Sequence, residues 1–418
     1  MIVSLRDAVP DTCGGKAAAL GALLRAGVPV PDGFVVPFAA YRSLGFGTSE
    51  DLDAVRRAIE ARPVGADLVD ALGRALGELG DPFVAVRSSA AGEDTAHASA
   101  AGRHDSFLGV RGVGAAAGAV RACWASLFSP RAVGGSLEEP VMAVIVQRHL
   151  DADVSGVMFT PGATTDIEAT WGLGPSVVEG KVTPDAFRVS TDGTVTSVVA
   201  SKRTRLDRRG ADLVVSDVLP RERHQPVIDD ATAAELARLG GEIAAVLGGP
   251  QDIEWAIVGG RIWILQARPI TAAPPPPVHA SAAADPARAT GTRAGATGGR
   301  ETAVGTLTGT PGSRGTVTGV ARVVRGRGDF GRVQPGDILI CPFTDPAWTP
   351  LLRIASGVVT ETGGVLCHAA IVAREHAIPA VLGIPDATSR LRDGAVITVD
   401  GSTGTVTEHT PTPRERAS

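Results

Sequence analysis

A proline- and alanine-rich stretch divides this chain and limits what it can fold into. Residues 272–305 contain a run of four prolines near their start and continue with Ala, Gly, Thr and Arg, without any apolar period. This composition is typical of a linker rather than of a packed core. As a flexible coil the stretch would hold its ends about 30 Å apart. We therefore predict two folded parts that change their relative position, although a passive spacer would have the same composition.

The two parts differ in size, and both mix helix and strand signals. The chain has 418 residues, of which 44% are hydrophobic, and domains commonly hold roughly 100–200 residues. We predict an α/β (α+β) protein with a first domain at 1–271, a smaller α/β domain at 306–409 and a disordered tail at 410–418.

Several classes of protein are disfavoured by composition. No apolar run reaches the roughly 18–20 residues of a membrane helix, and the N-terminus lacks the basic start and apolar core of a signal peptide. A net charge of −5 gives no reason to expect nucleic acid as a partner. The four cysteines are scattered, without a CxxC pair. We expect a cytoplasmic protein with reduced thiols and no membrane partner.

Apolar periodicity and turn residues predict the main elements. Helices are expected at 14–27, 51–80 and 367–377. Strands are expected at 82–90, at 316–324 and 337–343, at 395–400, and as a pair of core strands at 141–150 and 155–160. The two segments around Gly259-Gly260 read as a β-hairpin.

Lysine is rare in this chain, and its few positions therefore draw notice. The only lysines are Lys16, Lys181 and Lys202, while the other basic residues are arginine. A surface position that needs a positive charge would ordinarily be arginine here. A rare lysine can belong to a functional site, or it can be retained by chance, and rarity alone does not decide between these.

His368 follows a glycine pair and stands at the start of an expected helix, in the string TETGGVLCHAA. Free N–H groups and the positive end of the helix dipole favour an anion at such a position. A neutral imidazole there has the chemistry to accept a phosphoryl group. A lone histidine is more often structural or solvated, so the local pattern leaves both interpretations open.

The expected hairpin at 251–268 carries polar side chains on one face. Side chains alternate along a strand, so Asp252 and Glu254 share a face, as do Gln266 and Arg268 on the returning strand. A carboxylate, an amide oxygen and a guanidinium on one surface suit a magnesium-bound nucleotide. The same pattern also fits a plain solvent-facing side of a sheet.

Longer strings in both parts resemble one family. The segments TETGGVLCHAAIVAREHAIPAVLGI (360–384) and CPFTDPAWTPLL (341–352) resemble the phosphohistidine domain of the phosphoenolpyruvate-utilising enzymes. These enzymes include pyruvate phosphate dikinase, phosphoenolpyruvate synthase and rifampin phosphotransferase. Segments 14–36, 83–110 and 251–271 are similar to the nucleotide-binding domain of the same family. The resemblance implies an ATP-grasp domain followed by a small swivelling phosphohistidine domain.

The resemblance assigns roles to individual residues. His368 would be the phosphoryl carrier, and ATP and Mg²⁺ would be the cofactors. Lys16, Arg87 and Arg268 match the residues that contact the ATP phosphates, and arginine and lysine suit phosphate oxygens. Gln147 would contact the adenine.

The metal ligands and the phosphate lid also follow from the resemblance. Glu254 and Gln266 match the residues that hold the metal. Ser88, Ser89 and the loop near Glu93 and Asp94 would close over the triphosphate.

Two of the departures from the family pattern concern single residues. Pro175 stands where a glutamate is common, and Cys367 stands where serine or threonine often precedes the histidine. A further domain that binds the acceptor in the family has no counterpart among these 418 residues. We thus expect a short version of the family, with the acceptor bound somewhere else.

Three functions remain open from the sequence. The first is an ATP-dependent phosphotransferase that passes phosphoryl from His368 to a small molecule, releasing AMP and phosphate. The second is a donor subunit that phosphorylates an acceptor held by a separate partner protein. The third is an ATP-binding regulatory module without transfer. The acceptor's identity and the oligomeric state do not follow from the residues.

Overall fold

A computed structural model describes residues 2–45, 51–92, 104–129, 140–160, 162–270 and 303–409. Most of the predicted linker and the predicted tail at 410–418 lie outside these residues, as do Glu93 and Asp94. The chain divides into two compact units. The first consists of Met1–Ala273, Asp345–Thr349 and Leu366–His368, and the second of Pro274–Thr344, Pro350–Val365 and Ala369–Ser418.

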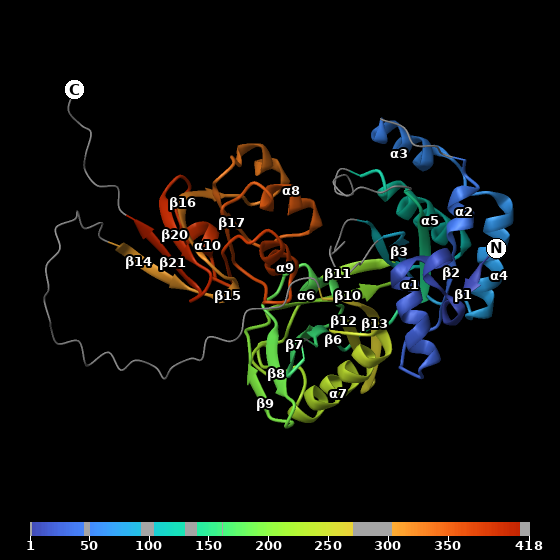
Figure 1. The fold of residues 1–418 in the computed structure, drawn as a ribbon, viewed down its shortest axis with the longest axis horizontal. Helices are drawn as coiled ribbons and strands as arrows, with labels where there is room; N and C mark the ends of the chain where they lie inside the picture. The colour runs from blue at the N-terminus through green and yellow to red at the C-terminus, as the bar shows by residue number, and fades with distance from the viewer. Residues whose placement is uncertain are drawn as a thin grey trace, which may run out of the picture. The chain divides into compact units, whose positions relative to one another are not determined.

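The first unit begins with a five-stranded sheet covered by helices (Figure 1). Its strand order is β1-β2-β5-β3-β4, and every described pairing in it is antiparallel. The strands are β1 (Val3–Ser4), β2 (Gly33–Val36), β3 (Val84–Ala90), β4 (Ser106–Val110) and β5 (Met142–Arg148). The helices are η1 (Leu5–Asp7), α1 (Pro10–Arg25), α2 (Phe38–Arg42), α3 (Leu52–Ala61), α4 (Ala66–Glu78) and α5 (Val113–Ser126).

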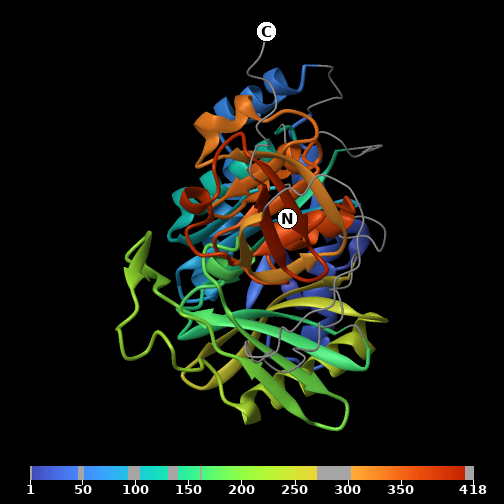
Figure 2. The same ribbon diagram turned by 90° about the vertical axis from the view of Figure 1, so that its left-hand side faces the viewer.

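A second, six-stranded sheet completes the first unit, with strand order β13-β12-β6-β7-β8-β9. Figure 2 shows its strands, green to yellow, fanned by the usual twist. Its strands are β6 (Val154–Phe159), β7 (Thr164–Trp171), β8 (Asp185–Ser190), β9 (Val195–Val198), β12 (Gln251–Val258) and β13 (Arg261–Pro269). Beside them lie α6 (Pro175–Val178), the two-stranded sheet of β10 (Thr204–Arg209) and β11 (Asp212–Asp217), and α7 (Asp230–Leu247).

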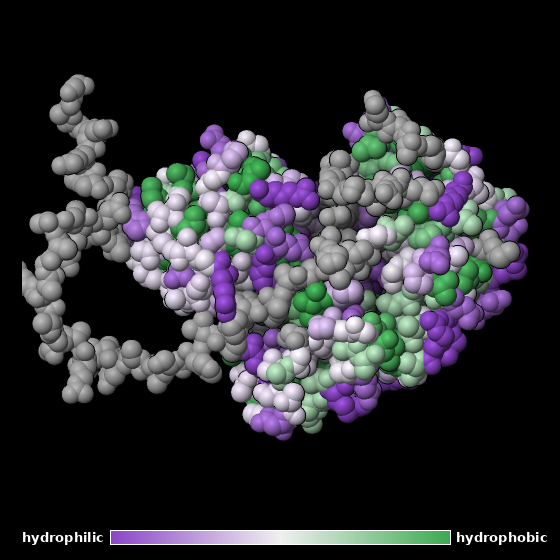
Figure 3. All heavy atoms as spheres, viewed as in Figure 1, coloured by the Kyte–Doolittle hydropathy of each residue, from purple (hydrophilic) through white to green (hydrophobic). Residues whose placement is uncertain are grey.

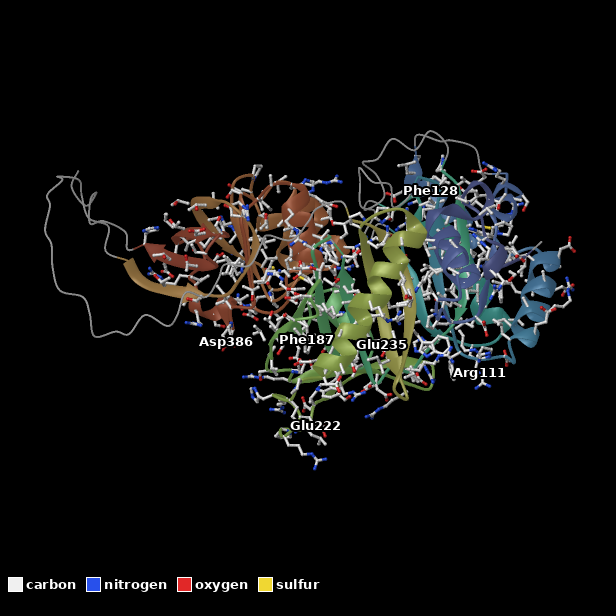
Figure 4. All side chains as sticks on the ribbon, turned by 60° about the horizontal axis from the view of Figure 1, so that its bottom comes forward. Arg111, Phe128, Phe187, Glu222, Glu235 and Asp386 are labelled. Atoms are coloured by element: carbon white, nitrogen blue, oxygen red, sulfur yellow. The ribbon has the colours of Figure 1, made fainter. Side chains whose placement is uncertain are left out.

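Helix α7 covers one face of the six-stranded sheet, which Figure 4 shows with Glu235 on the helix and Phe187 on β8 labelled. Phe187 is buried in the core of this unit together with α7 residues Leu236 and Ile243. Gly240 permits the close approach, because a Cβ there would lie 2.9 Å from the Thr160 side chain. The apolar face of the sheet is thus closed by α7, which leaves its other face for polar side chains.

The strands expected at 141–150 and 155–160 exist, but they do not pair with one another. β5 pairs with β2 and β3, whereas β6 pairs with β12 and β7. Both strands are buried along nearly their whole length, so each needs a neighbour on both sides. Apolar runs of this kind predict burial without naming the partner strand. The expected hairpin around Gly259-Gly260 is confirmed, with both glycines at positive φ.

The second unit is built on an eight-stranded mixed sheet in the order β14-β21-β20-β16-β17-β18-β19-β15. Strands β16, β17, β18 and β19 run parallel to one another, and every other described pairing in the sheet is antiparallel. The strands are β14 (Ala303–Thr308), β15 (Thr310–Ser313), β16 (Thr316–Val323), β17 (Ile338–Cys341), β18 (Gly357–Thr360), β19 (Ala380–Leu382), β20 (Val396–Asp400) and β21 (Thr405–His409). Its helices are η2 (Arg327–Arg332), α8 (Thr349–Leu352), α9 (His368–Glu375) and α10 (Ala387–Arg390). The first residues of α8 and α9, Thr349 and His368, are grouped with the first unit, as is η3 (Pro346–Trp348).

Figure 3 shows hydrophilic residues spread over the visible face of both units, with apolar residues between them singly or in small groups. Scattered apolar side chains are ordinary on a folded surface. Among the described residues, no helix is both long and apolar enough to cross a membrane.

A buried ion pair fixes the loops beyond β8. The side chains of Lys202 and Asp185 are both fully buried, and Lys202 Nζ donates to Asp185 Oδ1 at 2.5 Å. The same carboxylate accepts from the backbone N–H groups of Ala200 and Val227. Every group around this carboxylate is therefore a donor, and the pair is structural.

We predict that Lys202→Met destabilises the first unit by about 3–5 kcal/mol, because the substitution leaves the Asp185 carboxylate buried without its countercharge. Urea unfolding followed by tryptophan fluorescence measures the loss. Lys181→Met is the matched control, since Lys181 pairs with Glu179 at the surface, where such pairs contribute at most about 1 kcal/mol. Equal stability of the two variants would contradict a structural role for Lys202.

His149, just after β5, is nearly buried beside Asp151, with Nε2 3.5 Å from Asp151 Oδ1. Burial lowers the pKa of His149 to about 4, and the positive charges of Arg208 and Arg87 add to this, while Asp151 opposes it. The unfolded chain, with a histidine pKa near 6.5, therefore binds more protons than the folded chain between about pH 4 and 6.5.

We expect stability to fall as the pH drops from about 6.5 to 4, with a share of roughly 3 kcal/mol from His149. His149→Gln, which does not titrate, should flatten this part of the profile. Urea unfolding at pH 7, 5.5 and 4.5 gives the slopes. His224→Gln, the same replacement at an exposed histidine of the same unit, is the matched control variant.

Candidate active site

Lys16 lies directly after a break in helix α1. Gly14 has φ 77° and ψ 167°, so the helix stops and restarts at this glycine, and Lys16 is partly buried in the first turn that follows. This turn rests on strand β3, since Ser89 Oγ donates to the Cys13 carbonyl at 2.7 Å and accepts from the Ala17 N–H at 3.2 Å. The expectation that Ser89 faces the triphosphate is not supported, because it is fully buried.

Arg87, also on β3, reaches from the five-stranded sheet to the hairpin of the six-stranded sheet. Its Nη1 donates to the Leu265 carbonyl at 3.1 Å and lies 3.6 Å from Glu254 Oε2. The hairpin register shifts between Glu254 and Trp255, which makes Leu265 an extra, bulged residue on β13. A bulge takes a residue out of the regular ladder, and the Leu265 carbonyl is thereby available to Arg87.

The hairpin brings four of the expected polar residues onto one face. Glu254 stands directly opposite Gln266, and Asp252 directly opposite Arg268. Arg268 Nε and Nη2 donate to the same Asp252 oxygen at 2.9 and 2.6 Å. Asp252 is thus the residue that orients the Arg268 guanidinium, while Glu254 keeps a quarter of its side-chain surface exposed.

These side chains fit a magnesium ion carried by a nucleotide. Within the described ranges there is no group of three or more His, Cys, Asp or Glu side chains arranged to hold a metal. Directly opposed residues on paired strands have Cβ atoms about 5 Å apart, so the oxygens of Glu254 and Gln266 can share one ion. Mg²⁺ commonly takes one or two protein oxygens and completes its shell with phosphate oxygens and water.

Gln147 is placed differently from the other predicted ligands. Its side chain is 1% exposed, and its Nε2 donates to the Pro31 carbonyl at 3.1 Å. This bond ties β5 to the segment that leads into β2. In this structure the amide therefore serves the core, and the predicted contact with adenine has no geometric support here.

The polar face continues past the hairpin to residues that the sequence patterns did not indicate as ligands. Glu168 on β7 lies in the same cross-strand row as Glu254, with Val157 between them. In the next row Asp166 pairs with Arg188, whose Nε donates at 2.6 Å. The alternation of Asp166, Glu168 and Thr170 in TTDIEATW was the available signal, but only the register shows that it faces the hairpin's polar side.

His368 stands at the carboxyl edge of the parallel strands. β17 ends at Cys341 and β18 ends at Thr360, so the segments that follow these two neighbouring parallel strands both start at the same edge of the sheet. The two strings 341–352 and 360–384 therefore meet although they are separate in the sequence. Binding residues gather at such edges in open α/β sheets.

The imidazole of His368 is held in a defined environment. Its Nε2 lies 3.3 Å from Thr349 Oγ1, the first residue of α8. Burial lowers the pKa of His368 to about 4, while the charge of Asp345 opposes the shift. At neutral pH the ring is therefore uncharged and retains a lone pair for nucleophilic attack.

Arg374, in the last turn of α9, supports the glycine loop from behind. Its Nη1 donates to the carbonyls of Gly312 and Val365 at 3.0 and 2.7 Å. Val365 directly follows the glycine pair before His368. Arg374 thus anchors the backbone that leads into α9.

Comparisons with known proteins match both parts of the chain. Residues 10–288 match the family described as pyruvate phosphate dikinase, AMP/ATP-binding domain, and residues 333–404 match the PEP-utilising enzyme, mobile domain. These matches and the observed sheets confirm the predicted α/β fold, an ATP-grasp-type nucleotide-binding domain plus a small mobile domain.

Curated relatives align with almost the whole chain. A probable phosphoenolpyruvate synthase of Methanothermobacter thermautotrophicus is 37% identical, over 94% of this chain and 61% of that protein. The phosphoenolpyruvate synthases of Aeropyrum pernix and Escherichia coli are 35% and 32% identical, and the alignments cover 56% of each. The chain thus spans little more than half the length of these relatives. Because the AMP/ATP-binding model alone matches well over half of the 418 residues, the chain belongs to the phosphoenolpyruvate-utilising dikinase family.

Proposed function

We propose that this chain is an ATP-dependent phosphotransferase in which His368 carries the phosphoryl group. The observation that carries the proposal is a nearly buried histidine at a helix N-terminus, whose pKa burial lowers to about 4, in a chain that also contains a dikinase-type AMP/ATP-binding domain. A neutral imidazole is nucleophilic, and a helix N-terminus favours the anion formed on it.

The reaction would run in three balanced steps. A nitrogen lone pair of His368 forms a bond to the β-phosphorus of ATP, while the bond from that phosphorus to the α–β bridging oxygen breaks and AMP leaves. Water then attacks the γ-phosphorus, which releases phosphate and leaves one phosphoryl group on the ring. An oxygen of the acceptor takes this group, and His368 returns to its neutral form.

The residues of the first unit would position the triphosphate. Lys16, Arg87 and Arg268 supply positive charge to the phosphate oxygens, and the latter two are already oriented by backbone or carboxylate contacts. Preoriented charges stabilise the developing charge without reorganisation. Glu254 and Gln266 would hold Mg²⁺, which neutralises the β- and γ-phosphates when bound.

The acceptor is proposed to be a small molecule. The relatives are named phosphoenolpyruvate synthase, so pyruvate is the first acceptor to test. An acceptor held by a separate protein predicts AMP formation that rises when the partner is added. A regulatory module without transfer predicts ATP binding and no AMP.

We predict that His368→Ala abolishes the phosphoenzyme formed with β-³²P-ATP. The unmodified chain should keep the β-label on an acid-labile, base-stable adduct and release label from γ-³²P-ATP as phosphate. His376→Ala is the matched control, because His376 is exposed just beyond the same helix, and it should be labelled normally. Labelling of the His368 variant would rule out this carrier.

We also predict that Glu254→Gln raises the Mg²⁺ concentration for half-maximal AMP formation about tenfold or more, since a neutral amide replaces the anionic ligand. Glu242→Gln, at an exposed position of α7, serves as the control and should keep the original requirement. A normal Mg²⁺ requirement in the Glu254 variant, with ATP binding retained, would remove Glu254 from the metal site.

A further inference from the structure

Helix α1 is interrupted at a position that has no side chain. It spans Pro10–Arg25, yet Gly14 takes a left-handed, extended conformation inside it. The segment after Gly14 is thus a separate helical piece, and Lys16 lies in its first turn. This break, two residues before one of the few lysines of the chain, has a physical cause.

The cause is that this turn packs on Ser89 and is hydrogen-bonded to it. The Ser89 hydroxyl donates to the carbonyl of Cys13, before the break, and accepts from the N–H of Ala17, after it. One buried side chain therefore bonds to the backbone on both sides of the interruption. Its two bonds fix the distance and angle between the helical pieces, and with them the first turn that holds Lys16.

The approach is so close that only glycine fits. A Cβ on Gly14 would lie 2.5 Å from both the carbonyl oxygen and the Oγ of Ser89, well inside van der Waals contact. The positive φ of Gly14 is a second reason for glycine there. The absence of a side chain at Gly14 and the hydrogen bonds of Ser89 therefore act together to hold the break in α1.

The contact between Ser89 and the first turn after Gly14 also brings Lys16 to the side of β3 that carries Arg87. Residues two apart on a strand project from the same face, so Arg87 and Ser89 share a face of β3. Because Ser89 holds the break in α1, the turn with Lys16 lies over that face. Arg87 extends from there to Leu265 and Glu254.

We propose that Ser89 is a positioning residue for the triphosphate, acting through the turn that carries Lys16. This inference rests on the proposed ATP site. Ser89 does not touch the nucleotide, since its hydroxyl is fully buried and already makes a donated and an accepted bond.

The test compares Ser89→Ala with Ser126→Ala in the full chain. Ser126 is a matched control, because its buried hydroxyl also donates to one backbone carbonyl, that of Cys123, and accepts one backbone N–H, that of Asp105. Both variants should lose a similar amount of thermal stability. Only Ser89→Ala should bind the Mg²⁺ complex of α,β-methylene-ATP, whose α–β link resists cleavage, about tenfold more weakly by calorimetry, which is the scale of one charge-assisted contact.

A double-mutant cycle shows whether Ser89 acts through Lys16. If it does, Ser89→Ala should weaken binding much less in a Lys16→Met background than in the unmodified chain. Hydrogen exchange at the Ala17 amide, measured without nucleotide, should quicken in Ser89→Ala and stay unchanged in Ser126→Ala.

The outcomes separate the two proposals. If the unmodified chain binds the analogue and Ser89→Ala binds it equally well, the positioning role is overturned while the ATP site stands. If both serine variants weaken binding alike, Ser89 is merely structural and the inference fails. If the unmodified chain does not bind the analogue, the proposed function itself fails.

Discussion

The contact between Arg87 and the bulge on β13 is the interaction on which the polar face of the first unit depends. β3 and β13 belong to different sheets, and the Leu265 carbonyl links them. A guanidinium has five donors in a fixed plane, so one bond to a carbonyl orients the rest. Phosphate oxygens could then replace Glu254 as its partner without moving the side chain, and Glu254 would be released toward a metal. In the proposed ATP site, the bulge would therefore prepare a phosphate ligand and a metal ligand at once.

His368 illustrates how burial and helix position act in the same direction. Burial disfavours the protonated ring, although the charge of Asp345 opposes this shift. The positive end of a helix also disfavours a cation. In the proposed reaction the same field would favour the negatively charged product on the ring. Since Thr349 holds one nitrogen, the orientation of the ring is set as well as its charge. A solvated histidine would have the same nucleophile but would spend part of its time protonated near neutral pH.

Local patterns in the sequence predicted local structure well. The Gly-Gly hairpin, the helix at 367–377 and the shared face of Asp252 and Glu254 follow from turn chemistry and strand alternation, which act over a few residues. Strand partners did not follow, because apolar runs such as β5 and β6 are alike and burial does not name a neighbour. For the same reason Glu168 was overlooked, since its closeness to the hairpin depends on a register across three strands. Ser89 was expected to close over the triphosphate because of the family resemblance around Arg87, and that resemblance does not tell whether a serine hydroxyl is exposed or buried.

The three lysines show why residue type alone cannot assign a role. Lys202 is buried against Asp185, and backbone N–H groups donate to the same carboxylate. The charge of Lys202 therefore stabilises the folded unit and does not contact a ligand. Lys181 pairs with Glu179 near the surface, where water screens the charge. Lys16 differs from both in its backbone, because it follows a break that Gly14 permits and Ser89 holds. A continuous helix would also place a lysine on its surface, but the break fixes where the first turn after Gly14 lies, and the proposed role of Lys16 depends on the position of that turn.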